Sequence, residues 1–323
     1  MDELVIIKRD IHTNAAYGKA PRQRNLKELL DSGFLILDKP KGSTSNQAVE
    51  QVKGILGVET AGHIGTLDPE VSGVLPVLLG KSVHAAAYLN KDKKYIGVMQ
   101  LHKDIEEQKI RDAFSKFIGK INQLPPVKSA VARKLREREV FDLEIVEITK
   151  RSVLFKAHVE AGTYIRKLIH DVGQELGVGA NMFELRRTDV REVSEKDAVT
   201  PHELAEAMWL FKNENDERLL RKIVVPLEEA LEHFGIRMLW VADSAVDALC
   251  SGAQLMEPGL AAFNDKIKDG ETVAVMTTKD ELVAFAKSLY SSHDLTEVGR
   301  KQVAKTLRVM MERGIYPSWK KKK

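Results

Sequence analysis

The chain has 323 residues and contains little of several things that would mark a particular class of protein. A single cysteine, Cys250, excludes an intramolecular disulfide and a cysteine-based metal cluster, and it is typical of a reducing compartment. No run approaches the roughly 18 consecutive apolar residues of a membrane-spanning helix. The formal net charge is only +3, so overall basicity does not indicate a nucleic acid partner. The length of the chain predicts two or three domains. The shortage of cysteine and of long apolar runs favours a cytoplasmic protein without a membrane partner.

Positive charge is nevertheless concentrated in four clusters. Such clusters are the usual footprint of phosphate contacts, and the alternative for each is a solvated face or, at a chain end, a solubilising tail. For the second cluster we slightly favour RNA, with Arg133 and Lys134 as contacts, and for the last we favour the tail. The members are, in order, Lys8, Arg9, Lys19, Arg22, Arg24 and Lys27; Lys128, Arg133, Lys134, Arg136 and Arg138; Arg186 and Arg187; and the lysines at 320–323.

The segment 61–76, AGHIGTLDPEVSGVLP, has the composition of a shaped loop, because its glycines and prolines disfavour a long helix or strand. Its middle holds Asp68, and the following Pro69 pushes that residue toward an extended backbone. Taken alone, such an Asp-Pro is usually a turn residue whose side chain hydrogen-bonds its own backbone. The alternative is a reactive carboxylate, and other parts of the sequence have to decide between the two.

Strand and helix patterns follow one another without regular βαβ alternation, which predicts an α+β protein with a mixed, largely antiparallel sheet. The predicted strands are 34–37, 94–102, and a hairpin of 140–149 with 152–160. The predicted helices are one capped within 43–45 and ended by Gly57, then 81–89, 105–118, 164–176 capped by Thr163, and a set in 200–232 that begins at Pro201 and Pro226. Residues 226–235 are the predicted linker to a second domain.

After residue 235 the composition changes, and a strand is followed by a short helix capped by Asp243 or Ser244. The runs ELVAFAKSLY (281–290) and VAKTLRVMM (303–311) are ambiguous, and their residues alone lean toward helix. The segment DSAVDALCSGAQLMEPG, however, resembles the signature of a PUA domain, a small β-rich RNA-binding module. This resemblance implies that both ambiguous runs are strands and that Gly252 and Ala253 contact RNA.

Four further blocks, in the right order, resemble the TruB family of RNA pseudouridine synthases. They are GFLILDKPKGSTSNQAV (33–49), GHIGTLDPEVSGVLPV (62–77), KYIGVMQLH (94–102) and AGTYIRKLIHDVGQELGVGANMFELRRT (161–188). This family breaks the C1′–N1 bond of a uridine and rejoins the base through C5, without a metal or added cofactor. The resemblance therefore implies Asp68 as the nucleophile or base that starts the reaction.

The same resemblance assigns roles to the residues that would surround this carboxylate. Arg166 would pair with Asp68 and keep it charged, in a setting that we expect to be poorly solvated. Tyr95 would stack on the flipped base and help to remove the C5 proton. For each of these residues the ordinary alternative is a surface ion pair or core packing.

Four more residues match the substrate pocket of the family. Tyr164 and Leu185 would line the pocket, His63 would help to occupy the place of the departed base, and Lys39 would have a supporting role that is either structural or RNA-facing. The alternatives are core packing and, for His63, a turn residue satisfied by the backbone. Asn46 departs from the family pattern, in which histidine is common at this position.

The resemblance covers roughly residues 30–315 and is closest to the archaeal, dyskerin-like branch, the catalytic subunit of H/ACA guide ribonucleoproteins. It implies an N-terminal arm (1–32) packed on the PUA domain, a catalytic domain (33–232), a PUA domain (236–315) and a basic tail (316–323). The implied partners are H/ACA guide RNA, rRNA and tRNA substrates, a small zinc-ribbon-like subunit, a Gly/Arg-domain-family β-barrel protein and a kink-turn-binding ribosomal-like protein.

Other functions stay open at this point. The chain could be a stand-alone tRNA pseudouridine synthase or a non-catalytic RNA-binding scaffold of the same fold. An unrelated hydrolase that uses Asp68 would want a second carboxylate, and the loop offers only Glu70.

Overall fold

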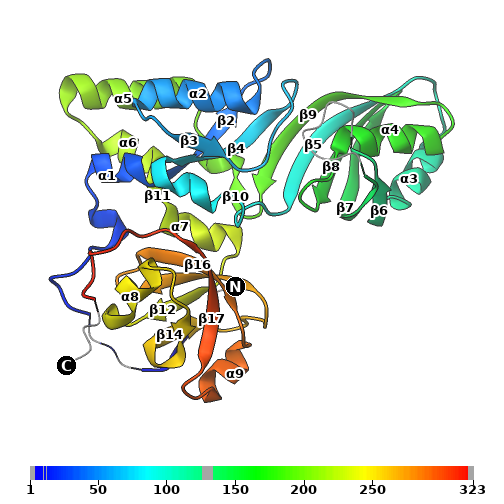
Figure 1. The fold of residues 1–323 in the computed structure, drawn as a ribbon. Helices are drawn as coiled ribbons and strands as arrows, with labels where there is room; N and C mark the ends of the chain where they lie inside the picture. The colour runs from blue at the N-terminus through cyan, green and yellow to red at the C-terminus, as the bar shows by residue number, and fades with distance from the viewer. Residues whose placement is uncertain (1–3, 10, 12, 126–133, 319–323) are drawn as a thin grey trace.

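The computed structural model describes residues 4–9, 11, 13–125 and 134–318. Arg133 and the lysines at 320–323 lie outside these residues, so what the sequence predicts for them stays a prediction. Figure 1 shows a long sheet across the upper part of the view and a smaller, β-rich domain below one of its ends. Within the part of the chain that is described, no helix is both long and apolar enough to cross a membrane.

The larger sheet has ten strands, in the order β11-β2-β4-β9-β5-β8-β7-β6, with β3 beside β4 and β10 beside β9. Among these described strands, β4 and β9 pair in parallel and the other pairs are antiparallel, so the predicted α+β class with a mixed sheet is confirmed. The predicted hairpin is confirmed as β7 and β8. The strands are β2 (Gly33–Lys39), β3 (Ala61–His63), β4 (Ser72–Leu79), β5 (Lys93–Leu101), β6 (Gly119–Gln123), β7 (Arg136–Thr149), β8 (Ser152–Val159), β9 (Ala180–Val190), β10 (Val193–Ser194) and β11 (Val225–Pro226).

Seven helices accompany this sheet in the described residues. Figure 1 shows α2 and α5 side by side near β2 and β3, and α3 and α4 beside the β6–β8 end of the sheet. The helices are α1 (Leu26–Asp31), α2 (Ser45–Leu56), α3 (Glu107–Ser115), α4 (Ile165–Glu175), α5 (Pro201–Glu214), α6 (Arg218–Ile223) and α7 (Leu227–Leu231).

Local sequence explains where α2 begins and ends. Thr44 is its N-cap: the Thr44 hydroxyl accepts from the Gln47 backbone N–H, and the Gln47 side chain accepts from the Thr44 N–H. Apolar residues at helical spacing are buried on one face, and Gly57 ends the helix in a left-handed conformation with φ +69°. The helix predicted from capping residues and spacing is therefore confirmed.

Two local predictions in this domain are wrong. Thr163 does not cap α4, because the N-cap position belongs to Tyr164 and no side chain caps the helix. The helix predicted at 81–89 is a 3₁₀ helix, η2 (Gly80–Ala85), followed by a turn. Its buried residues, Ser82 and Ala85, are three apart, which fits the three-residue period of a 3₁₀ helix.

The smaller domain is built on a seven-stranded sheet in the order β1-β14-β12-β15-β16-β17-β13. Both ambiguous runs are strands, as the resemblance implied. The helix predicted after the first strand is α8, but its N-cap is Ala242, while Asp243 accepts from the Asn14 N–H at 2.9 Å. The elements are β1 (Val5–Ile7), β12 (Met238–Val241), α8 (Asp243–Cys250), β13 (Leu255–Met256), β14 (Leu260–Asn264), β15 (Thr272–Thr277), β16 (Leu282–Ser288), α9 (Ser292–Glu297) and β17 (Gln302–Val309).

The linker predicted at 226–235 is wrong, because this segment is buried structure between the two sheets. It forms α7 and the 3₁₀ helix η4 (Glu232–Phe234), and Leu231 and Phe234 are fully buried. They share one hydrophobic cluster with Phe34 of β2 and with Met238 and Phe285 of the smaller domain. Figure 1 shows α7 at the junction of the two domains. The two sheets are thus joined by a common core rather than by a loose connection.

The N-terminal arm is held on the smaller domain by a strand and by ion pairs. Strand β1 pairs antiparallel with β14. Five of the six members of the first basic cluster, all but the exposed Lys27, pair with carboxylates of this chain, so they are not the open phosphate footprint that clustering predicts. The pairs are Lys8 and Arg9 with Glu257, Lys19 with Glu28, Arg22 with Glu229, and Arg24 with Glu228.

Candidate active site

The Asp68 loop is shorter than the sequence suggests, since β3 and β4 flank an irregular segment of residues 64–71. Its conformation is fixed immediately before Asp68 by Ser45, the first residue of α2. The buried Ser45 hydroxyl donates to the Leu67 carbonyl at 2.9 Å and accepts from the Leu67 N–H at 2.8 Å. After the aspartate, the Pro69 carbonyl accepts from the Gly42 N–H at 2.9 Å. Gly42 of the β2–α2 connection and Ser45 of α2 therefore hold the backbone on both sides of Asp68.

Asp68 pairs with Arg166, as the sequence predicts. Arg166 lies in the first turn of α4, and its Nη2 donates to Asp68 Oδ2. The Asp68 side chain is 53% exposed and the Arg166 side chain 61% exposed, so the expected poorly solvated setting is absent from the protein alone. A nucleotide bound over the loop would supply that cover, because an exposed ion pair loses its water when a ligand closes over it.

Tyr95 and Leu185 form an apolar wall on two paired strands of the larger sheet. Both residues are nearly buried, lie on the neighbouring strands β5 and β9, and belong to the same hydrophobic cluster as Leu67 beside Asp68. Close packing here depends on Gly97, because a Cβ at that position would lie 3.0 Å from Leu185 Cδ1 and 2.8 Å from Phe155 Cζ. The wall is thus a rigid surface of the kind on which a flipped base can stack.

Tyr164 is positioned through its backbone by Gln123, a residue that the sequence did not single out. The Tyr164 N–H donates to Gln123 Oε1 at 2.9 Å, and Gln123 Nε2 donates to the Tyr164 carbonyl at 3.2 Å. Because Gln123 is 2% exposed and ends β6, it anchors the start of α4, and with it Arg166. A glutamine at the end of a strand is a weak sequence signal, which explains why it was missed.

His63 and Lys39 surround the loop from β3 and β2. His63 Nε2 lies 3.2 Å from Asn46 Oδ1, so the residue that departs from the family pattern contacts a candidate pocket residue. Burial and the nearby Arg187 lower the pKa of His63, which keeps the imidazole neutral near pH 7. Lys39 is fully buried and donates to the carbonyls of Pro40 and Ser43 at 2.7 and 2.8 Å. This contradicts the RNA-facing alternative for Lys39 and favours the structural one.

The third basic cluster is also not a phosphate footprint. Arg187 is fully buried on β9 and donates to the carbonyls of Val74 and Gly65 at 2.7 and 2.9 Å. Its neighbour Arg186 forms a bidentate pair with Asp38 and a further pair with Glu195. The sequence signal was two adjacent arginines, and nothing in it distinguishes a buried guanidinium from an exposed one.

The remaining candidate RNA contacts are exposed and distant in sequence from the Asp68 loop. Lys134 is exposed just before β7. Gly252 and Ala253 form an exposed turn after α8, where the Ala253 carbonyl accepts from the Thr306 hydroxyl at 2.7 Å and a Cβ at Gly252 would meet nothing within 4 Å. Such an open turn leaves room for a backbone approach by a nucleic acid.

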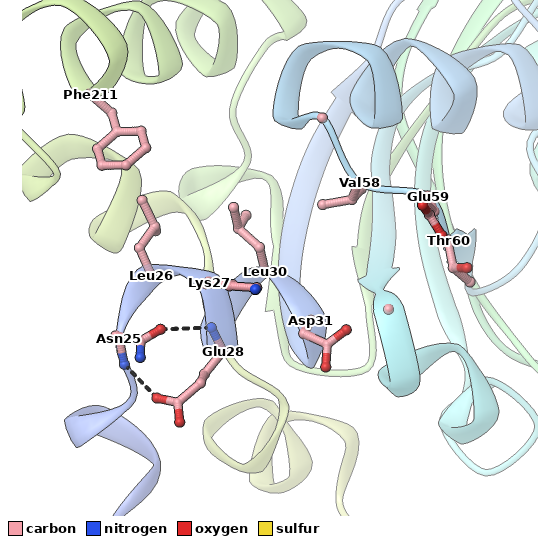
Figure 2. A pocket seen from close by; sticks show the side chains of 12 residues that line it. Asn25, Leu26, Lys27, Glu28, Leu30, Asp31, Val58, Glu59, Thr60 and Phe211 are labelled. Atoms are coloured by element: carbon pink, nitrogen blue, oxygen red, sulfur yellow. Dashed lines mark hydrogen bonds between the residues drawn. The ribbon is translucent and has the colours of Figure 1, made fainter.

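A separate cavity of about 610 Å³ lies between α1, the α2–β3 connection and α5 (Figure 2). Leu26, Leu30 and Phe211 line it, together with the reciprocal Asn25–Glu28 hydrogen bonds that cap α1. None of the residues around Asp68 contributes to its wall. We therefore place the candidate chemistry at the Asp68 loop rather than in this cavity.

Sequence models of known families match the chain in four consecutive stretches. Residues 1–49 match the DKCLD (NUC011) domain, 53–165 the TruB family pseudouridylate synthase N-terminal domain, 166–232 the tRNA pseudouridylate synthase B C-terminal domain, and 237–310 the PUA domain.

Similar proteins match nearly the whole chain. A probable tRNA pseudouridine synthase B of Pyrobaculum arsenaticum is 46% identical over 98% of this chain and 96% of the relative. One of Methanosarcina barkeri is 43% identical over 99% of this chain and 95% of the relative. Among solved structures, a Cbf5-Nop10-Gar1 complex contains a chain with 43% identity and a TM-score of 0.90, covering 98% of this chain and 97% of that one. An H/ACA ribonucleoprotein bound to a substrate RNA containing 2′-deoxyuridine gives 41% identity and a TM-score of 0.89 over 98% and 97%.

Proposed function

Because the chain belongs to the TruB family of pseudouridine synthases and is therefore an RNA isomerase, we propose that Asp68 is the residue that starts its reaction. The observation that supports this most strongly is the Asp68–Arg166 pair, in a chain whose neighbouring strands β5 and β9 carry the apolar wall of Tyr95 and Leu185. The pair supplies an oriented carboxylate, and the wall supplies a surface for one base. A uridine has to leave its stack to reach them, at a cost of a few kcal/mol.

The proposed reaction assigns a task to each group. Asp68 acts as nucleophile or base while the C1′–N1 bond breaks, and Arg166 keeps the carboxylate charged and aimed. The released base stays stacked on Tyr95, turns, and forms a new bond from C5 to C1′. Tyr95 then helps to remove the C5 proton, which completes pseudouridine. Tyr164, Leu185 and His63 confine the base during the turn, and Lys39 holds the loop.

We further propose that the chain works in the cytoplasm as the catalytic subunit of an H/ACA ribonucleoprotein, with guide RNA pairing to rRNA. The solved relatives that match it over almost its full length are in complexes with Nop10 and Gar1 and with substrate RNA. The zinc-ribbon-like, β-barrel and kink-turn-binding subunits implied by the sequence would complete the particle. Lys134, Arg133, Gly252 and Ala253 would contact RNA.

A second candidate is guide-free modification of the T-loop uridine of tRNA, because close relatives are named tRNA pseudouridine synthase B. The test is release of tritium from RNA that carries [5-³H]uridine. One reaction would hold the purified chain with a tRNA transcript, and another would hold rRNA substrate, guide RNA and the accessory subunits. Release only in the guided reaction supports the ribonucleoprotein function, and release from tRNA alone supports the second. RNA binding without release in either reaction would contradict both and favour the scaffold.

A further inference from the structure

Arg187 is a buried cation without a counter-charge. The residue is 0% exposed, and two of its guanidinium nitrogens donate to backbone carbonyls rather than to a carboxylate. The third nitrogen, Nη1, has no hydrogen-bond partner, and no ion pair to Arg187 exists among the described residues. Burial lowers the pKa of Arg187 for this reason. A buried unpaired charge is costly, so its presence beside a reactive loop calls for a function.

The titratable side chains that interact with this guanidinium are basic, except for one. Burial, and after it the charge of Arg187, lowers the pKa of Lys39, of His63 and of Lys93, so the guanidinium lies among three further basic groups. Tyr95 is the exception, because its phenol raises the pKa of Arg187. Tyr95 and Arg187 are direct cross-strand partners of β5 and β9, so their side chains lie on the same face of the sheet. Of these neighbours, the Tyr95 phenol is the group that can carry a negative charge.

We propose that Arg187 is a positioning residue that supplies the positive charge for Tyr95 when its phenolate oxygen accepts the C5 proton. The Tyr95 phenol first gives its proton to solvent, and the charge of Arg187 stabilises the phenolate that results. The C5–H bond then breaks and its proton moves to this phenolate oxygen. The bonding electrons form the C5–C6 double bond, and N1, which had been doubly bonded to C6, takes a proton from solvent. The proposal rests on the function proposed above. It assigns to Arg187 the positive charge that stabilises the Tyr95 phenolate during removal of the C5 proton.

The same guanidinium also contacts both the Asp68 loop and the strand that carries Tyr95. It holds the carbonyl of Gly65, three residues before Asp68, and that of Val74 in β4, while lying beside Tyr95. Gly65 adopts φ +73°, and a Cβ there would lie 3.4 Å from Arg187 Nη1. The loop therefore approaches the guanidinium closely, and one side chain fixes Tyr95 relative to the carboxylate that begins the reaction.

The test separates proton removal from the earlier steps by using two RNAs in single-turnover reactions of the guided assembly. Tritium release from [5-³H]uridine requires loss of the C5 hydrogen. RNA with 5-fluorouridine at the target reports bond formation alone, because fluorine cannot leave as a cation and the product stays at the adduct. Arg187→Met removes the charge and keeps the volume, and Arg187→Lys keeps the charge. Arg186→Lys is the matched control on the opposite face of the same strand.

We expect Arg187→Met to slow tritium release at least 100-fold while adduct formation stays within threefold of the wild type. Arg187→Lys should keep release within tenfold, and Arg186→Lys should change neither rate by more than twofold. If the Met variant does not fold, the double variant Arg187→Lys/Tyr95→Phe tests the inference instead. Its rate of tritium release should equal that of Tyr95→Phe alone, because Arg187 acts through Tyr95.

Equal slowing of release and adduct formation in the Met variant would overturn the inference and leave Arg187 a merely structural residue. Additive loss in the double variant would overturn it as well. A wild-type assembly that gives neither release nor adduct would instead overturn the proposed function itself, and the inference with it.

Discussion

Lys93 shows how burial near the site sets a pH dependence. The side chain is 5% exposed and donates to Asn90 Oδ1 at 2.8 Å and to the Lys91 carbonyl. Burial, helped by Arg187, lowers the pKa of Lys93 to about 7. In the unfolded chain the pKa returns to roughly 10.4. Between these values the unfolded state binds more protons, so the free energy of unfolding rises with pH, by up to about 1.4 kcal/mol per unit.

Lys93→Met should therefore be more stable than the wild type at pH 6, and the advantage should shrink as the pH approaches 10. Urea denaturation at pH 6, 8 and 9.5 measures this difference. Lys94→Met, at the exposed neighbouring position, is the control and should show no such trend. A Lys93→Met effect that is the same at every pH would contradict the assigned shift.

Substitution of Ser45, with Ser43 as the control position, tests what holds the loop before Asp68. Ser45→Ala leaves the buried Leu67 N–H and carbonyl without their partner, which should cost about 1–3 kcal/mol of stability. Because Leu67 is adjacent to Asp68, kcat should fall more than KM rises. The Ser43 hydroxyl has no partner, so Ser43→Ala should change neither quantity. Equal effects of the two substitutions, in urea denaturation and steady-state kinetics, would show that Ser45 does not hold the loop.

At the residue scale, the contact between Asp68 and Arg166 was predicted, whereas the residues that support the Asp68 loop were not. Asp68 and Arg166 are in contact, as the resemblance to the family implied. Ser45 was predicted only as a helix cap, and Arg187 as a surface cation. Both roles depend on side chains that meet across elements far apart in the sequence, and single-sequence patterns do not contain that information.

Among the elements, β4 and β9 depend on one glycine for their parallel contact. Gly73 pairs with Arg187 at φ +105°, and a Cβ there would lie 2.1 Å from the Arg187 carbonyl oxygen. Gly73→Ala should therefore destabilise the protein by more than about 2 kcal/mol. Gly54→Ala is the control, because this glycine lies within α2 with nothing within 4 Å of a new Cβ, and it should stabilise the protein by about 0.5–1 kcal/mol. Thermal unfolding measures both, and a neutral Gly73→Ala would contradict the close approach.

The strand β16 shows why local sequence misleads at this scale. Its residues are divided between two cores: Leu282 and Phe285 join the cluster shared with the larger domain, while Val283, Ala284 and Ala286 join the cluster within the smaller one. A strand buried on both faces has a continuous apolar run instead of an alternating one, so its pattern resembles a buried helix. Only the resemblance to a PUA domain predicted it correctly.

The whole molecule is held together by contacts that the sequence did not suggest, including those of the arm with the buried Glu257 of the smaller domain. Lys8 and Arg9 both pair with this carboxylate, Arg9 at 2.5 Å, and the residue is 4% exposed. Glu257→Ala leaves two partly buried cations unpaired, so it should cost about 1–3 kcal/mol and increase protease cleavage within residues 1–20. Glu297→Ala, at an exposed position of α9, should do neither. An arm that stays equally protected in both variants would show that β1 alone holds it.

Domain order was predictable because four motif blocks and the PUA signature occur in sequence order. The junction was not, since proline and glycine at 226 and 235 indicated a linker where the chain forms α7 and shares a core with Phe34. Proline and glycine mark where a helix begins or ends, but they do not report whether the segment between them is buried. Burial depends on the second sheet, which lies elsewhere in the sequence.

The central claim is that the Asp68 carboxylate starts the isomerisation, and Asp68→Asn tests it most directly. Asparagine keeps the size and removes the charge, and Glu70→Gln makes the same change at the exposed acid two residues on. Tritium release from [5-³H]uridine RNA should fall at least about 1,000-fold in Asp68→Asn, with RNA binding within twofold of the wild type. Glu70→Gln should release tritium at nearly the wild-type rate. A fully active Asp68→Asn protein would contradict the account.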